Sequence, residues 1–175
     1  AAPGTDAELS MDSTSIKASA QAGRGIESEQ NSDIKRIGKT RGGLNTKIHA
    51  IVGKDLRPVA FLLSAGNVDD CTEAVSLLKL LPALKDCDIL ADKAYGTKEI
   101  RTYLHDQSAR YTIPPKVNTK QPWPFDKETY KRRNVIEHFF NRLREFRRAE
   151  TRYDKRDDSF LAFVMVDSIC VAFGI

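Results

Sequence analysis

The sequence predicts one α/β domain, a mixed five-stranded sheet with flanking helices, from its length, its composition and the order of its segments. A chain of 175 residues fits a single ordinary domain. With 41% hydrophobic and 30% charged residues, it can bury a core beneath a polar surface. No stretch approaches the eighteen or so consecutive apolar residues that a membrane span needs. We therefore expect a soluble domain with no membrane partner.

Three strand-like segments come first. Residues 11–18 alternate weakly, whereas residues 46–52 place Ile48 and Val52 on one face, and residues 59–63 form a short apolar run. Turn residues separate these segments, so they are expected to form an antiparallel meander.

The pattern then changes to alternating helices and strands. A helix is expected from Asp69 until Pro82, a strand at residues 87–91, a helix capped by Thr97, and a strand at residues 111–113. Two helices follow, one over about residues 126–148 and a last one from about Ser159, whose apolar sequence suggests a core helix. This order is that of a ribonuclease-H-like fold, in which the first strand lies centrally beside the fourth.

The domain is expected to occupy residues 11–175, after a polar leader at residues 1–10. Residues 19–43 are rich in Ser, Gly, Gln and charge, and predict a long, basic, flexible loop. Three cysteines without the Cys-x-x-Cys spacing of a zinc site suggest reduced, buried thiols and a cytoplasmic location.

Positive charge is concentrated near the end of the chain. Residues 131–156 hold ten Lys or Arg against four acids, a local excess of +6, although the whole chain carries only +4. A basic band of this kind suits a polyanion such as DNA. On charge alone, a solvated helix face explains it equally well.

The predicted helix over residues 126–148 carries one polar stripe. At 100° per residue, Tyr130, Arg133, Glu137 and Arg144 share an arc of about 60°, and the apolar residues face the other way. A carboxylate among cations suits a metal ligand beside a phosphate, because the metal binds the carboxylate and the cations bind phosphate oxygens. The alternative is an ordinary amphipathic helix with a solvated face.

Two further carboxylates are candidates for the same site. Asp92 follows the buried strand at residues 87–91, where ligands bind in α/β sheets, although such a residue often only caps a turn. Asp12 is weaker alone, but in the expected topology it meets Asp92 and Glu137 at one end of the sheet. Three such carboxylates suit two Mg²⁺ or Mn²⁺ ions about 3.5–4 Å apart.

These residues resemble a known family, the DDE transposases of bacterial insertion sequences, in the branch named after insertion sequence five. The most specific match is the signature Tyr-x2-Arg-x3-Glu-x6-Lys, present as Tyr130, Arg133, Glu137 and Arg144. Other matching blocks run in order along the chain, at residues 11–14, 42–49, 91–95, 113–115, 133–143 and 151–155.

The resemblance implies a catalytic triad and metal ligands at Asp12, Asp92 and Glu137. It implies hydrolysis at transposon ends, transfer of the 3′-hydroxyl into target DNA, a homodimer and a bacterial, nucleoid-associated location. Tyr130, Arg133 and Arg144 would contact double-stranded DNA at the transposon end or target. Further candidate DNA contacts are Lys93, Asn141, Arg148 and, by base stacking, Trp123.

The chain also departs from the family pattern. Arg144 stands where the signature has Lys, and Gly96 where relatives often have Asp. Family members normally begin with a helical DNA-binding region, whereas only eleven residues precede Asp12 here. Residues 1–10 could therefore be the remnant of a missing N-terminal region. Alternative functions are an inactive DNA-binding remnant and a structure-specific nuclease on the same fold.

Overall fold

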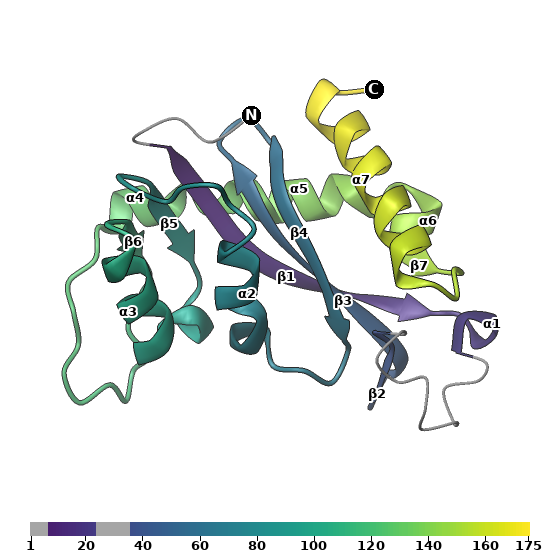
Figure 1. Ribbon diagram of the computed structural model, residues 1–175, viewed down its shortest axis with the longest axis horizontal. Helices are drawn as coiled ribbons and strands as arrows, with labels where there is room; N and C mark the ends of the chain where they lie inside the picture. Colours follow the sequence, from purple (N-terminus) through teal and green to yellow (C-terminus); the bar gives the residue numbers. More distant parts are fainter. Residues whose placement is uncertain (1–6, 24–35) are drawn as a thin grey trace.

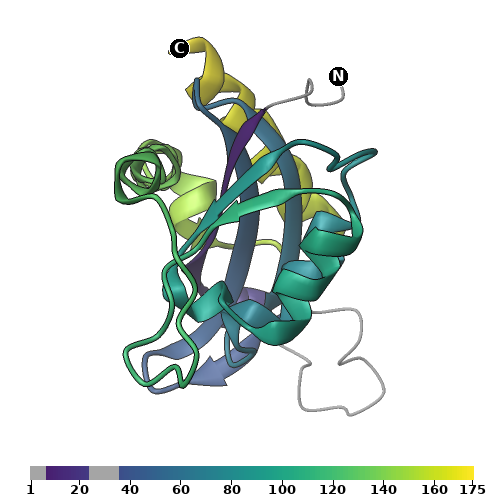
Figure 2. The same ribbon diagram turned by 90° about the vertical axis from the view of Figure 1, so that its left-hand side faces the viewer.

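A computed structural model describes residues 7–23 and 36–175 and shows a mixed sheet with helices on both faces (Figures 1 and 2). Most of the predicted leader and residues 24–35 of the predicted basic loop lie outside the described residues. The described part of that loop contains a short helix and a short strand.

The sheet has the central order predicted from the sequence, with two additional short strands. The path is β2-β3-β1-β5-β6, with β4 beside β3 and β7 beside β1. Strand bounds are β1 (Glu8–Ala18), β2 (Gly38–Thr40), β3 (Gly43–Gly53), β4 (Pro58–Ala65), β5 (Asp88–Ala91), β6 (Arg110–Thr112) and β7 (Thr151–Arg152). Because β2 and β7 have only three and two residues, they carry too little pattern to be predicted.

Strand β1 lies at the centre and pairs with neighbours of opposite direction. It is antiparallel to β3, with Asp12 opposite Ala50, and parallel to β5, where the last pair is Met11 with Ala91. The expected meander of β1, β3 and β4 and the expected contact of the first strand with the fourth are both confirmed.

Helices cover both faces of the sheet and give it two hydrophobic cores (Figure 2). Met11, Ile51 and Leu77 belong to the core beneath α2 and α3, whereas Ile48 and Phe139 belong to the core beneath α5 and α7. The helical elements are α1 (Ala20–Gly23), η2 (Asp70–Glu73), α2 (Ala74–Leu78), η3 (Lys93–Tyr95), α3 (Lys98–Asp106), α4 (Lys127–Lys131), α5 (Asn134–Leu143), α6 (Arg147–Glu150) and α7 (Asp157–Phe173).

The continuous helix predicted over residues 126–148 is wrong, because α4, α5 and α6 replace it. Between α4 and α5 the backbone stays helical but tightens to i→i+3 hydrogen bonds, for example from the Ile136 N–H to the Arg133 carbonyl at 3.1 Å. Phe146 then adopts an extended conformation before α6. The first break separates Tyr130 from the rest of the predicted polar stripe but keeps Arg133 one turn before Glu137.

Helix α7 differs from the predicted core helix. Only Phe160, Val164, Ser168 and Val171 are buried, and large apolar side chains on its other side are exposed. Of the three cysteines, Cys87 alone is buried, whereas Cys71 and Cys170 are partly exposed. In the part of the chain that the structure describes, no helix is long and apolar enough to cross a membrane.

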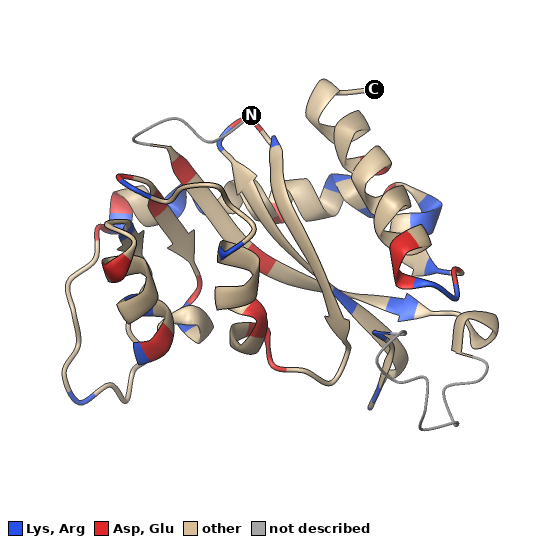
Figure 3. Cartoon of the chain, viewed as in Figure 1, with Lys and Arg blue, Asp and Glu red and all other residues tan. Residues whose placement is uncertain are grey.

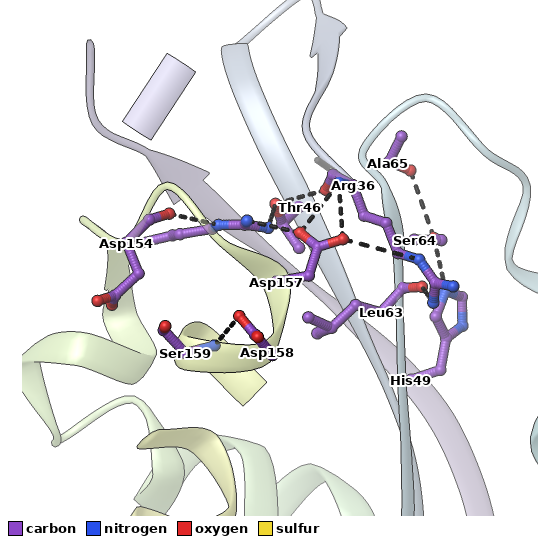
Figure 4. Close-up of polar contacts among 11 residues, drawn as sticks. Arg36, Thr46, His49, Leu63, Ser64, Ala65, Asp154, Asp157, Asp158 and Ser159 are labelled. Atoms are coloured by element: carbon purple, nitrogen blue, oxygen red, sulfur yellow. Dashed lines mark hydrogen bonds and ion pairs between the residues drawn. The ribbon is translucent and has the colours of Figure 1, made fainter. Parts of the chain in front are cut away.

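Arg152 in β7 anchors the start of α7 to the sheet, although its side chain is completely buried. Its guanidinium donates to the Asp157 carboxylate at 2.6 Å, to the Thr46 hydroxyl at 2.9 Å and to the Asp154 carbonyl at 3.0 Å. The Asp157 carboxylate also accepts from the Arg36 backbone N–H (Figure 4). Each polar group of this cluster is therefore matched from within the protein.

Candidate active site

Asp12 and Asp92 lie next to each other at the end of the parallel pair β1 and β5. The last residues paired between these strands are Met11 and Ala91, so the two aspartates follow immediately on neighbouring strands. Parallel strands are about 4.8 Å apart, which brings the two carboxylates within electrostatic reach. This confirms the side-by-side placement of the two strands expected from the topology, and Asp92 lies at the carboxyl end of β5, the position at which α/β proteins bind ligands.

Backbone N–H groups orient both carboxylates. The Ser13 N–H donates to Asp12 Oδ1 at 2.8 Å, and the Ala94 N–H donates to Asp92 Oδ1 at 2.6 Å, which makes Asp92 the N-cap of η3. The capping role considered for Asp92 is therefore real, but it uses only one of the two carboxylate oxygens. Among the described residues, no hydrogen bond to Asp92 Oδ2 is seen.

Asp12 is a carboxylate in an unfavourable environment. Burial raises its pKa and the neighbouring Asp92 raises it further, against the lowering effects of the Ser13 N–H and Arg133. The net shift is upward, so the cations and donors around Asp12 do not fully compensate its charge.

Arg133 connects Asp12 to Glu137. Its Nη1 donates to Asp12 Oδ2 at 2.9 Å, and its Nη2 donates to Glu137 Oε1. Its side chain is only 14% exposed, whereas that of Glu137 is 50% exposed. Burial would lower the pKa of Arg133, but Asp12, Tyr130 and Glu137 outweigh it and raise the pKa. The carboxylates of Asp12 and Glu137 are thus joined through a guanidinium.

The carboxylate oxygens of Asp12 and Asp92 are the type of ligand that binds a hard divalent cation. Two adjacent carboxylates with incompletely compensated charge are the oxygen ligands that Mg²⁺ and Mn²⁺ prefer. Within residues 7–23 and 36–175, however, no three acidic, His or Cys side chains are close enough together to form a metal-binding group. The Glu137 carboxylate forms an ion pair with Arg133.

A partly buried polar network holds the opposite side of β1. The Ser13 hydroxyl donates to Asp70 Oδ1 at 2.7 Å, and Lys47 Nζ donates to the same oxygen at 2.7 Å. The Tyr95 hydroxyl is buried among Asp12, Asp70 and Asp92, and burial, followed by these charges, raises its pKa. This network fixes the residue next to Asp12. The sequence indicated Asp70 only as a helix start, because no spacing rule connects η2 to β1 and β3.

The predicted signature cations and aromatic residue flank the carboxylates. The Arg133 guanidinium lies 5.7 Å from the centre of the Tyr130 ring, and that ring packs edge-on against Phe125. Arg144, just after α5, donates to the Thr14 hydroxyl, two residues beyond Asp12 on β1. The structure therefore gathers Tyr130, Arg133 and Arg144 along the same side of β1 as Asp12.

The other candidate DNA contacts are less concentrated. Lys93 and Asn141 are exposed, and Arg148 pairs with Asp154 at 3.1 Å while stacking on Phe163. The Trp123 indole N–H donates to the Ile113 carbonyl at 2.8 Å, and Arg101 covers its ring at 3.9 Å. Trp123 thus packs on the domain. Its stacking on a DNA base, like the other three contacts, stays a prediction.

The basic band over residues 131–156 is partly neutralised (Figure 3). At least six of its ten cations form ion pairs, namely Lys131, Arg132, Arg133, Arg148, Arg152 and Arg156. One of these, Arg152, is completely buried and cannot face a polyanion. The local excess of +6 therefore overstates the charge presented to solvent.

Comparison with known proteins identifies the family. A family model described as a transposase DDE domain matches residues 3–173. The chain belongs to this family. A protein of Brucella ovis, assigned as a transposase for insertion sequence element IS6501, is 34% identical over 123 residues, which cover 69% of this chain and 92% of the relative. A protein of Burkholderia cepacia, assigned as a transposase for element IS402, is 26% identical over 149 residues, 75% of this chain and 68% of the relative.

The family assignment confirms two expectations. The resemblance to insertion-sequence transposases is correct, and the mixed sheet with flanking helices is the ribonuclease-H-like fold of DDE domains. DDE transposases are generally catalytic and typically use divalent metal ions. The family match does not by itself assign roles to individual residues of this chain.

Proposed function

We propose that this DDE domain cleaves the phosphodiester at transposon ends and transfers the resulting 3′-hydroxyl into target DNA, using divalent metal ions. The observation that supports it is the arrangement of the charged groups around β1. Asp12 and Asp92 lie where the parallel pairing of β1 and β5 ends, and Arg133 forms ion pairs with both Asp12 and Glu137.

Asp12, Asp92 and Glu137 are the residues that would hold Mg²⁺ or Mn²⁺. When bound, two such ions would activate the attacking oxygen and stabilise the leaving oxygen. Glu137 is exposed and held only at Arg133 among the contacts described, so its carboxylate can turn toward the aspartates by a side-chain rotation.

Arg133 is proposed to exchange a carboxylate for a phosphate of the DNA. Its fork already makes two charge-assisted hydrogen bonds, a geometry that equally suits two phosphate oxygens. Tyr130 and Arg144 would extend this contact along the backbone, and Lys93, Asn141 and Arg148 would add more distant ones. Because Arg133 is mostly buried, it holds its position before DNA arrives, which reduces the ordering cost of binding.

The test is a strand-transfer assay with a pre-cut duplex bearing a 3′-hydroxyl, a supercoiled plasmid as target, and Mg²⁺ or Mn²⁺. The duplex sequence would come from the inverted repeats that flank the gene. Glu137→Gln should reduce joining by about a thousandfold or more, because it removes a metal-binding charge without changing shape. Glu145→Gln is the matched control, since Glu145 is an exposed carboxylate shortly after α5.

Three outcomes would contradict the proposal. Joining that is unchanged in Glu137→Gln would remove Glu137 from the site. Hydrolysis without any joining would indicate a structure-specific nuclease. DNA binding without cleavage in the unmodified chain, insensitive to all three carboxylate substitutions, would indicate an inactive remnant.

A further inference from the structure

Helix α7 carries two apolar stripes, and residues 7–23 and 36–175 cover only one of them. The buried residues Phe160, Val164, Ser168 and Val171 face β4 and α5. At 100° per residue, the stripe of Ala162, Val166, Ile169 and Phe173 lies about 180° away from them. Val166, Ile169 and Phe173 are 57%, 52% and 77% exposed. Figure 1 shows α7 at the periphery of the domain, leading to the C-terminus.

The spacing of the exposed stripe is specific for a partner helix. Its members follow each other at intervals of four, three and four residues, which is the heptad spacing of helices that pack side by side. Its immediate neighbours Met165, Cys170 and Ala172 are also apolar or weakly polar, and Phe163 farther round the helix is covered by Arg148. A charged or strongly polar residue would be expected here if the stripe faced only water.

We propose that this stripe packs antiparallel against α7 of a second copy of the chain. An antiparallel pair centred midway between Val166 and Ile169 places Val166 opposite Ile169 of the other copy. This pairing also places the small Ala162 opposite the large Phe173, so each pair of residues fills a similar volume between the two helices. A parallel pair would instead set Phe173 against Phe173 and Ala162 against Ala162.

The charged start of α7 agrees with the antiparallel arrangement. Asp158 projects on the same side as the stripe and pairs with Arg156. In the antiparallel pair, Asp158 lies one helical turn before Ala162, outside the stripe. The four stripe residues therefore meet only one another across the contact.

The available area suits a dimer. The exposed apolar side chains of α7 offer on the order of 600 Å² in each copy. Two copies together thus bury at most roughly 1,200 Å², the lower limit for specific interfaces. The stripe is entirely apolar, so its partner needs an apolar surface of the same spacing, and a second copy of α7 has one. This inference does not depend on the proposed reaction.

The test is the oligomeric state of the intact chain by sedimentation velocity, at concentrations up to roughly 100 µM. The unmodified protein should be a dimer. Val166→Glu and Ile169→Lys should each raise the dissociation constant by about a hundredfold or more, since a charge is then buried against an apolar residue. Leu80→Glu is the control, because Leu80 is similarly exposed but lies outside α7.

The two substitutions together distinguish the arrangements. In the antiparallel pair, the carboxylate introduced at position 166 of one copy meets the ammonium introduced at position 169 of the other, so Val166→Glu/Ile169→Lys should restore the dimer. In a parallel pair, like charges meet and the dimer should stay broken, which would overturn the proposed register. A monomeric unmodified chain, or a dimer that survives Val166→Glu, would overturn the surface itself. Circular dichroism should show intact folding in every variant, because both positions are exposed.

Discussion

Two charge clusters lie on strand β1, and they differ in how far the protein compensates their buried charge. At the Lys17–Ala18 end, next to β7, Arg152 is completely buried, and Asp157, Thr46 and the Asp154 carbonyl accept its hydrogen bonds. Near the end of β5, Asp12 and Asp92 lie side by side, and within the described part of the chain Asp12 has a direct ion pair with Arg133 alone.

The difference separates a structural role from a functional one. A buried charge whose partners all come from the protein stabilises one arrangement of the chain, here the start of α7 against the sheet. A carboxylate whose environment raises its pKa retains an unmet demand for positive charge, which an external cation can supply. Both clusters contain arginine and aspartate, so residue type alone does not distinguish them.

The sharpest way to break this comparison is to remove one member from each cluster. Arg152→Met should lower the free energy of unfolding by about 3–5 kcal/mol, because it deprives the partly buried Asp157 of its closer cation and leaves only Arg36, at 3.9 Å, among the ion pairs described. Asp12→Asn should cause no such loss, because it removes the repulsion from Asp92 and the cost of burying the charge. Urea unfolding followed by circular dichroism would measure both.

The companion variant Arg152→Met/Asp157→Asn should recover part of the lost stability, since it also removes the carboxylate that has lost its closer cation. If Asp12→Asn lowered the free energy of unfolding as much as Arg152→Met, the acidic cluster of Asp12 and Asp92 would also be structural. The distinction between the two clusters would then fail.

The sequence predicted the framework of the site better than its details. The strand order placed Asp12 beside Asp92 because residue periodicity identifies strands and because parallel connections have few topologies. The charge count, by contrast, included Arg152 among the cations available to DNA, although it is completely buried. A count of charges along the sequence does not show which of the side chains are buried.

The helix that carries Glu137 shows the same limit. Periodicity correctly placed Ile136, Phe139 and Leu143 toward the core, because burial selects apolar residues at helical spacing. The break at Phe146 and the tightened turn at Arg133 depend on tertiary packing and left no mark in the pattern. The bridge from Arg133 to Asp12 spans 121 residues of sequence, so no local rule could have found it.

His49 lies on β3 between the two clusters and gives a weaker, pH-dependent comparison. Its ring is buried and bonded to the Ser64 hydroxyl at 2.8 Å. Burial, with Lys47 and Arg36 and against Asp70, lowers the pKa of His49 to about 4. The unfolded chain, with an ordinary pKa near 6.5, therefore binds more protons in this range.

The contribution of His49 to stability should be complete above about pH 6.5 and should be lost as the pH falls toward 4, by up to about 3 kcal/mol. The measurement is the difference in unfolding free energy between the protein and His49→Gln from pH 4.5 to 8. Gln keeps a donor for Ser64 but does not titrate, so the difference should change with pH. A difference that is constant across this range would show that His49 has an ordinary pKa in the folded protein.

The smallest expected effect concerns the edge of the acidic cluster, where Gly96 contacts Trp123. A Cβ at Gly96 would lie 3.1 Å from Trp123 Cζ2, so Gly96→Ala must displace the ring. Gly96 has a negative φ, so steric contact and not backbone strain should lower stability, by about 1–2 kcal/mol. Trp123 is the single tryptophan of the chain, so tryptophan fluorescence reports on this ring alone. Displacement of the ring toward water should shift the emission to longer wavelength.

Gly42→Ala is the control for this change, since its Cβ would meet only the Thr40 hydroxyl, at an ordinary 3.7 Å. Both variants reduce the freedom of the unfolded chain similarly, so their difference isolates the contact with Trp123. If the fluorescence of Gly96→Ala matched that of the unmodified protein, the Trp123 loop would be adaptable and would not belong to the rigid surroundings of Asp92. A shift accompanied by weaker strand transfer would instead join this loop to the site, which would also explain why a residue without a side chain occupies position 96.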